Sequence, residues 1–190
     1  MVTASNSPMR FDNLLDQCRA FPDEPSLKQV GQLLETANLD EGEVGQRQVA
    51  DPSRPYGRQV LLATEKIEAM LATWTPRTWC APHDHGGSVG GVRVLRGRAR
   101  HRVFRITDGA LKLVKEETVE AGDILRCGPS LVHQLRAEDD ELVTLHVYAG
   151  PIDFMRVYEE GKTFIVDGGC GAWVPHDEPA LLREVHAHIG

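Results

Sequence analysis

The chain has 190 residues, enough for one domain with a substantial core, and it carries a formal net charge of −7 and a pI near 5.6. It has no Lys/Arg block or basic arm, no apolar stretch long enough to cross a bilayer, and a polar start over residues 1–8 without the apolar core of a secretion signal. Its four cysteines are scattered without Cys-x-x-Cys pairs, which is typical of a reducing compartment, so we expect a cytoplasmic protein with no nucleic-acid or membrane partner.

Helices are predicted in the first 45 residues. Asp12 or Asn13 could cap a first helix, whose apolar residues recur at helical spacing at Phe11, Leu14, Leu15 and Cys18. Ser26 could cap a second helix, whose apolar stripe is Leu27, Val30, Leu33, Leu34 and Ala37. The segment Glu41–Tyr56 is polar and rich in Gly and Pro, so we predict a loop there.

The character of the sequence changes at Arg58, where short strands separated by turn residues begin. The predicted strands are Arg58–Thr64, Ile67–Trp74, Gly91–Leu95, Arg100–Ile106, Leu111–Val119, Ile124–Cys127, Val132–Arg136 and Glu141–Tyr148. We expect a hairpin through Arg96-Gly97-Arg98 and a tight turn at Asp108-Gly109. Many short strands of this kind are typical of an antiparallel sandwich or barrel. The stretch after Gly168 is predicted to be irregular, with a final short helix over Pro179–His188.

Three histidines at the starts of strand-like segments carry the strongest chemical signal. His83 and His85 are one residue apart and would point to the same side of an extended chain, because side chains alternate with a period of two. His133 follows a Gly-Pro turn and begins a distant strand. Imidazole nitrogens suit iron, zinc, copper and nickel, and a triad leaves coordination positions open for substrates. We therefore predict that His83, His85 and His133 bind one catalytic metal ion.

The same histidines carry a resemblance to the cupin superfamily. The run His83-Asp84-His85, followed by Gly90 and Gly97, resembles the first cupin motif. The second motif has its counterpart in Gly122, Gly128-Pro129 and His133, one residue shorter than usual between the proline and the histidine. Gly90 stands where most cupins carry an acidic ligand, so the resemblance implies three neutral ligands and no carboxylate.

The fold that the resemblance implies is mainly β: a cupin-type antiparallel β-barrel, or double-stranded jelly roll, with N-terminal helices. We expect a single cupin domain over residues 1–190. Within it, residues 1–45 would form the helical segment, residues 56–166 the β-barrel and residues 167–190 a C-terminal tail.

A three-histidine cupin of this pattern resembles the thiol dioxygenase family, whose best-known member is cysteine dioxygenase. Tyr56-Gly57-Arg58 resembles the family's Tyr-x-Arg, whose arginine binds the substrate carboxylate. Thr144, His146 and Tyr148 resemble its Ser-x-His-x-Tyr relay, with threonine in place of serine. The resemblance spans roughly residues 56–158. Animal members carry a cysteine at the position of Gly90, cross-linked to the relay tyrosine, so that cross-link cannot form here.

The resemblance implies an Fe(2+) enzyme that adds both atoms of O2 to the sulfur of a small thiol carboxylate, converting L-cysteine to cysteine sulfinate. Three neutral imidazoles leave the site with a charge near +2, which favours a thiolate ligand. Arg58 and Tyr56 would bind the substrate, and Tyr148, His146 and Thr144 would serve as catalytic residues. We expect a monomer whose partners are the thiol and O2.

Two alternatives remain open. Related enzymes for 3-mercaptopropionate carry glutamine at the Arg58 position and a separate arginine after the relay tyrosine, where Arg156 could serve, so that acid or another small thiol acid is an alternative substrate. A cupin that binds a metal or ligand without turnover is the alternative from another class.

Asp84 could be a partner of the ligands or a surface carboxylate, and His101 shows no ligand spacing.

Overall fold

The computed structural model describes residues 8–175 and 179–185, which form a β-rich body with helices against one side. The helices are α1 (Phe11–Arg19), α2 (Leu27–Thr36) and α3 (Glu41–Gln46). The strands are β1 (Tyr56–Ala63), β2 (Ile67–Trp74), β3 (Val89–Arg96), β4 (Arg98–Thr107), β5 (Ala110–Glu120), β6 (Ile124–Cys127), β7 (Val132–Ala137), β8 (Val143–Ala149), β9 (Phe154–Glu159), β10 (Lys162–Asp167) and β11 (Leu181–Val185). None of the helices in the described ranges is long and apolar enough to cross a membrane.

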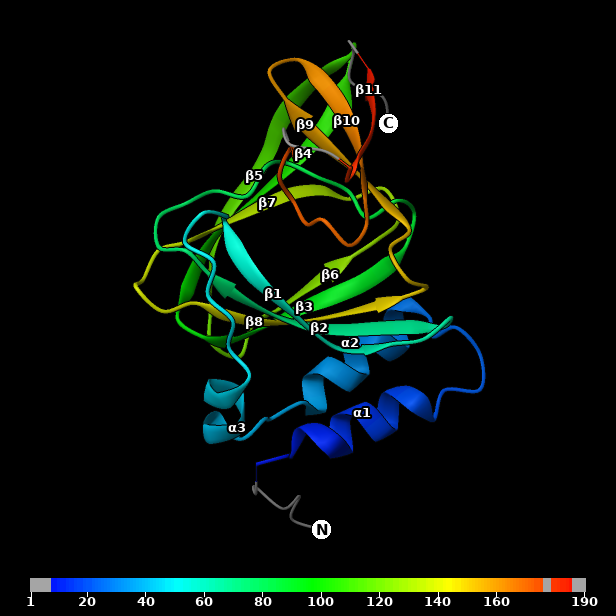
Figure 1. The fold of residues 1–190 in the computed structure, drawn as a ribbon, viewed down its shortest axis with the longest axis vertical. Coiled ribbons are helices and arrows are strands. Elements are labelled where there is room, and N and C mark those ends of the chain that lie inside the picture. Colours follow the sequence, from blue (N-terminus) through cyan, green and yellow to red (C-terminus); the bar gives the residue numbers. More distant parts are fainter. Residues whose placement is uncertain (1–7, 176–178, 186–190) are drawn as a thin grey trace.

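The strands form antiparallel sheets that curve around a common interior. A five-stranded sheet has the order β1-β2-β8-β3-β6, and two three-stranded sheets have the orders β5-β4-β7 and β11-β10-β9. All pairings between the strands are antiparallel. In Figure 1 the five-stranded sheet lies between the helices and the other two sheets. This is the predicted cupin-type antiparallel β-barrel with N-terminal helices.

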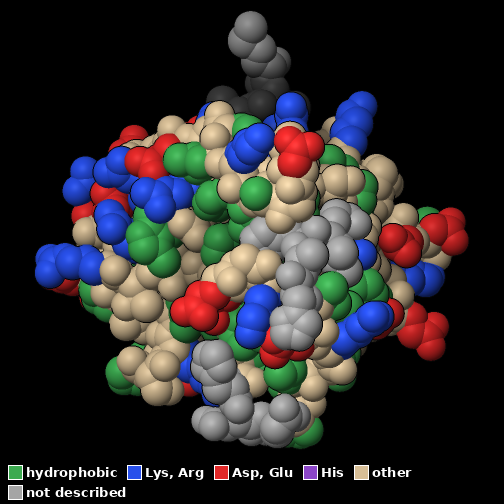
Figure 2. Space-filling model, turned by 90° about the horizontal axis from the view of Figure 1, so that it is seen from above, with side chains coloured by type: hydrophobic (Ala, Val, Ile, Leu, Met, Phe, Trp, Pro, Cys, Tyr) green, Lys and Arg blue, Asp and Glu red, His purple; other side chains and the backbone are tan. Residues whose placement is uncertain are grey.

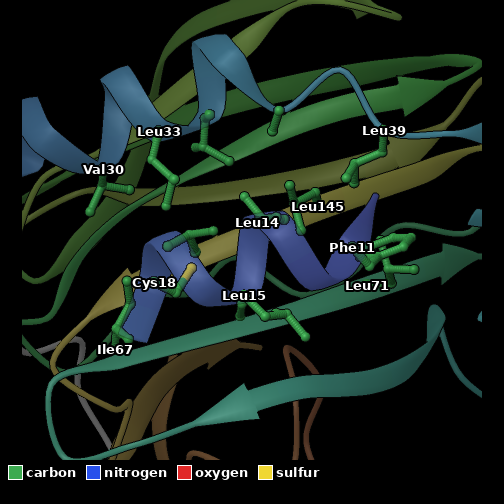
Figure 3. Close-up of a cluster of buried hydrophobic side chains, with 14 of the residues drawn as sticks. Phe11, Leu14, Leu15, Cys18, Val30, Leu33, Leu39, Ile67, Leu71 and Leu145 are labelled. Atoms are coloured by element: carbon green, nitrogen blue, oxygen red, sulfur yellow. The ribbon is translucent and has the colours of Figure 1, made fainter. Parts of the chain in front are cut away.

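Strand β8 has two different faces, one packed against the helices and one directed into the barrel interior. Val143, Leu145 and Val147 point toward the helices, where they join a buried cluster with α1 and α2. Figure 3 shows Leu145 beside Leu14 of α1 in this cluster. Burial of each such side chain stabilises the fold by about 1.5–3 kcal/mol. Because side chains alternate along a strand, the residues between them face the barrel interior.

The helix ends follow the predicted capping chemistry only in part. Ser26 caps α2 and forms a capping box with Gln29, as expected. The cap predicted at Asp12 or Asn13 is wrong, because α1 already begins at Phe11, whose N–H donates to Glu43 Oε2 at 2.8 Å. Glu43 belongs to α3, which replaces the beginning of the predicted loop.

The predicted hairpin through Gly97 is wrong, because the two strands beside it belong to different sheets. Strand β3 pairs with β6 and β8, whereas β4 pairs with β5 and β7. Gly97 has a φ of +80°, and a Cβ there would overlap the backbone of Glu141. It therefore turns the chain from one sheet into the next. The tight turn at Asp108-Gly109 is confirmed between β4 and β5.

The C-terminal prediction also needs correction. Residues 181–185 form strand β11 on the edge of β10, so the helix predicted from Pro179 is wrong over its described part. The remainder of that prediction, residues 186–188, lies outside the described residues. On the face shown in Figure 2, Lys and Arg side chains lie among Asp and Glu side chains, without a large area of one sign.

Candidate metal centre

The three predicted ligands come together inside the barrel. His83 and His85 lie on the segment between β2 and β3, and His133 lies on β7. Backbone hydrogen bonds join His83 and His133 in both directions, with N···O distances of 2.9 and 3.0 Å. One ring nitrogen from each of the three lies within 4.8 Å of the others, and no carboxylate of the described chain joins the group. The site could therefore hold a metal ion with three neutral donors.

The outer hydrogen bonds of the rings orient their lone pairs inward. His83 Nδ1 lies 2.9 Å from the carbonyl oxygen of Ala81, and His133 Nδ1 lies 3.1 Å from His101 Nε2. The opposite nitrogen of His133, Nε2, lies 3.4 Å from Nε2 of His85. With protons on the outer nitrogens, two lone pairs face each other across a buried space. A cation between them would relieve that repulsion, so the donor set fits a metal ion.

Burial keeps these imidazoles neutral. The side chains of His83, His85 and His133 are between 1% and 7% exposed. Burial lowers the pKa of His83, and it lowers the pKa values of His85 and His133 well below the ordinary value, because a charged ring would lose its hydration. Neutral imidazole is the form that binds metals.

Gly90 lies against the ring of Tyr148. A Cβ at this position would overlap that ring and lie 2.7 Å from the carbonyl oxygen of Val147. The corner where other cupins place an acidic ligand is thus filled by Tyr148. The absence of a side chain at Gly90 therefore both excludes a carboxylate and makes room for the tyrosine.

A substitution at Gly90 should therefore be costly. We expect Gly90→Ala to lower the free energy of unfolding by about 1–3 kcal/mol, as overpacking of a core does, and to displace Tyr148. Gly128→Ala is the matched control, because a Cβ there meets no atom within 4 Å. Urea unfolding of both variants checks this, and equal stability of the two would contradict it.

The three relay residues form one hydrogen-bonded chain on the inner face of β8. Thr144 Oγ1 lies 2.7 Å from His146 Nε2, and His146 Nδ1 lies 3.0 Å from the hydroxyl of Tyr148. That hydroxyl lies 3.3 Å from His85 Nε2, so the chain ends at the candidate metal centre. Trp74 donates from Nε1 to Thr144 Oγ1 at 2.9 Å. Burial raises the pKa of Tyr148 well above its ordinary value, which keeps the phenol protonated.

His146 should make the fold sensitive to acid. Burial, with smaller effects of His83 and Arg58, lowers the pKa of His146 from 6.5 to about 3. Below pH 6.5 this residue is therefore protonated in the unfolded protein but stays neutral in the folded protein. The free energy of unfolding falls as the pH drops from 6.5 toward 3. The shift corresponds to roughly 3–5 kcal/mol. His146→Gln does not titrate there, so chemical denaturation of the metal-free protein should show a flatter pH dependence; identical slopes would contradict this.

The predicted substrate residues lie on β1. The hydroxyl of Tyr56 accepts a hydrogen bond from Ala172 N–H at 2.8 Å. The Arg58 guanidinium donates to Met70 Sδ at 2.9 Å and to the carbonyl oxygen of Gly169 at 3.2 Å. It also forms an ion pair with Glu68, whose side chain is 9% exposed. Sequence analysis did not identify Glu68, whose only local signal is a charged residue at an inward position of β2.

Arg156 is engaged elsewhere. Its NH1 donates to Asp84 Oδ2 at 3.0 Å, and its backbone N–H donates to Asp84 Oδ1 at 3.1 Å. Asp84 also accepts from Gly86 N–H and from the Tyr158 hydroxyl, and it is 4% exposed. Asp84 is thus a buried carboxylate that holds the segment carrying His83 and His85, and the surface interpretation is wrong.

His101 is a second site residue that sequence analysis missed. It lies on β4, is 4% exposed and contacts His133. A signal existed in the pattern of this strand: His101 shares the inward parity of Ala99, while the arginines beside it alternate outward. A buried histidine on a strand otherwise lined outside by charges needs a hydrogen-bonding partner.

A small cavity opens at the centre of these groups. It is lined by the three histidines, by His146 and Tyr148 of the relay and by both substrate-binding candidates, together with Met70, Trp74, Leu135, Ile152, Met155, Gly168 and Gly171. Its free volume is about 20 Å³, little more than the roughly 10–15 Å³ that one water needs. Such a space favours small ligands. Trp79, in contrast, does not line it, and the ring of Trp79 contacts the guanidinium groups of Arg102 and Arg136.

Comparison with known proteins gives a family match over most of the chain. A family model described as cysteine dioxygenase type I matches residues 2–161. Among solved structures, a conserved protein with a double-stranded β-helix domain from Klebsiella pneumoniae subsp. pneumoniae is 20% identical over 62% of this chain and 95% of its own, with a TM-score of 0.49. TT1209 from Thermus thermophilus is 18% identical over 56% of this chain and 93% of its own, with a TM-score of 0.47. On the family match, the chain belongs to the cysteine dioxygenase type I family.

Proposed function

We propose that this protein is an iron-dependent thiol dioxygenase that converts a small thiol carboxylate, with L-cysteine as the first candidate, to its sulfinate. In this reaction R–SH and O2 give R–SO2H: the S–H and O–O bonds break, two S–O bonds and one O–H bond form, and sulfur loses the four electrons that dioxygen gains. The observation that carries the proposal is the triad of buried, neutral imidazoles without a carboxylate, with a tyrosine hydroxyl beside it.

Iron(II), when held by His83, His85 and His133, would supply the electron transfer between sulfur and triplet dioxygen that is otherwise slow. The chain's own residues would hold the reactants. Tyr148 presents a protonated hydroxyl to the cavity, and His146 fixes its direction at 3.0 Å. That hydroxyl could donate a hydrogen bond to a sulfur or oxygen atom bound there.

Arg58 is the proposed anchor for the substrate carboxylate. It lines the cavity, whereas Arg156 does not, and Arg156 is held by Asp84. A guanidinium can bind a carboxylate through two parallel hydrogen bonds, which also orients the thiol end. Because Arg156 is held by Asp84, its contacts favour Arg58 over Arg156 as the anchor of the carboxylate. 3-Mercaptopropionate shares the thiol and carboxylate and is the alternative substrate.

Oxygen uptake across a panel of thiols tests the proposal. Protein purified without oxygen and loaded with Fe(II) should consume O2 with L-cysteine, in a 1:1 ratio to sulfinate formed. 3-Mercaptopropionate, mercaptosuccinate and cysteamine complete the panel. No uptake with any of the four would contradict the proposal, and tightly bound zinc without uptake would instead support a cupin that binds metal without turnover.

A further inference from the structure

His101 is a buried partner of one candidate ligand. In the register of β4 with β7, Val103 lies opposite His133 and His101 lies opposite Leu135. His101 and His133 are therefore diagonal neighbours on the same face of the sheet. Their ring centroids are 5.3 Å apart and the ring planes meet at 83°. The edge of one imidazole is thus directed at the other.

The contact continues to a carboxylate. His133 Nδ1 lies 3.1 Å from His101 Nε2, and His101 Nδ1 lies 3.1 Å from Glu117 Oε1. Glu117 is directly opposite His101 in the pairing of β4 with β5. Its other oxygen accepts from Nζ of the exposed Lys115 at 2.8 Å. The chain of contacts therefore runs from the protein surface to the centre of the barrel.

Only one arrangement of protons suits the contacts among His133, His101 and Glu117 when His133 binds a metal. Its Nε2 faces the other ligands, so that atom must keep its lone pair and the proton must lie on Nδ1. His101 Nε2 then accepts that proton's hydrogen bond. His101 Nδ1 carries the remaining ring proton and donates to Glu117, whose carboxylate can only accept. Each N–H in this series of contacts then has an acceptor.

The other two candidate ligands are supported differently. His83 Nδ1 has the backbone carbonyl of Ala81 as its partner. His85 Nδ1 is buried and has no partner among the described residues. Among the residues that the structure describes, His133 is thus the only one of the three whose hydrogen bonds end on a carboxylate. An imidazole backed by a carboxylate is fixed in its ring orientation and is a stronger electron donor to a metal.

We propose that His101 and Glu117 are positioning residues for the metal centre: they hold His133 with Nε2 directed inward and strengthen it as a ligand. The inference depends on metal binding by the three histidines and does not depend on which substrate is oxidised. Loss of this support should weaken metal affinity even though neither residue touches the metal.

Cobalt(II) binding to the metal-free full-length protein tests the inference, with affinity measured by chelator competition and the ligand field by visible absorption. His101→Phe removes the acceptor and should weaken cobalt affinity about 10–100-fold, with a shifted spectrum. His101→Gln offers an amide oxygen to His133 Nδ1 and should restore most of that affinity. Glu117→Gln keeps an acceptor but removes the charge, so a smaller loss is expected.

Glu116→Gln is the matched control. Glu116 is the neighbour of Glu117 on β5 and pairs with Arg100 and Arg102 on the outer face, away from the histidines. It should leave cobalt affinity and spectrum unchanged. Wild-type affinity and spectrum in His101→Phe would overturn the inference. So would a loss in Glu116→Gln as large as in Glu117→Gln.

The folding of each variant is measured separately from its cobalt affinity. Thermal melting of the metal-free variants identifies any that do not fold; if His101→Phe is one of them, wild-type affinity in Glu117→Gln overturns the inference. Because the assay contains neither thiol nor oxygen, a protein that oxidises no thiol can still give the expected cobalt result. Failure of the proposed function and failure of this inference are therefore distinguishable.

Discussion

Replacement of His85 by alanine is expected to abolish stoichiometric iron binding and, with it, thiol-dependent oxygen consumption. Two imidazoles would remain, too few to retain the ion, so the loss of affinity should exceed the roughly 10–100-fold typical of partners that only support a ligand. His85 is the informative choice because its Nδ1 has no partner among the described residues. Removal of the His85 ring therefore leaves no former partner of Nδ1 without a hydrogen bond. Iron content after gel filtration and oxygen-electrode traces measure the two effects.

The control is Ser88→Ala in the same loop. Ser88 donates to the carbonyl oxygen of Pro151 at 3.2 Å and does not line the cavity. This variant should keep both iron and activity. A His85→Ala protein with one iron per chain would show that the three histidines do not form the metal site.

Replacement of Arg58 by glutamine should lower kcat/KM for thiol carboxylates by about 100-fold. Two charge-assisted hydrogen bonds to a carboxylate are worth roughly 3 kcal/mol together, and every 1.4 kcal/mol is a factor of about ten. Glutamine still offers a donor to Glu68, so that buried carboxylate is not left alone. Cysteamine has no carboxylate, and its kcat/KM should change far less. Steady-state oxygen uptake with cysteine and cysteamine provides the comparison, and equal losses for both thiols would contradict the anchor role.

Glu68→Gln is the matched variant with the opposite expected sign. Glu68 pairs with Arg58 and so competes with a substrate carboxylate for the same guanidinium. Neutralising Glu68 should strengthen the attraction of Arg58 for a carboxylate and lower KM for cysteine several-fold, with little change for cysteamine. A higher KM for cysteine in this variant would mean that Glu68 instead helps to hold the substrate or Arg58.

Predictions from local sequence patterns succeeded where one segment carries its own signal. The capping box at Ser26 joins residues three apart, and the limits of β2 and β6 match the predicted ones. The alternation of β8 predicted which of its side chains share a face, and the structure brings Thr144, His146 and Tyr148 into one hydrogen-bonded chain. The substrate-binding and catalytic roles of these residues stay predictions.

Predictions that required knowledge of strand partners failed. Two neighbouring strands around Gly97 were expected to pair, but each finds its partners in another sheet. The cap of α1 comes from Glu43, more than thirty residues away, and β11 forms as a strand because the edge of β10 accepts it. In each case a distant group satisfies backbone hydrogen bonds that a local interpretation must assign nearby.

The sequence by itself determined the three-histidine set, the missing carboxylate at Gly90 and the alternation that orients the relay, because spacing along one strand decides which face a side chain takes. Only the tertiary structure decided what surrounds them: Glu68 on Arg58, Asp84 between Arg156 and Tyr158, and Glu117 behind His101. These contacts join separate strands or loops. They depend on which segments pair and in what register, and that is decided by packing of the whole barrel rather than by any local run of residues.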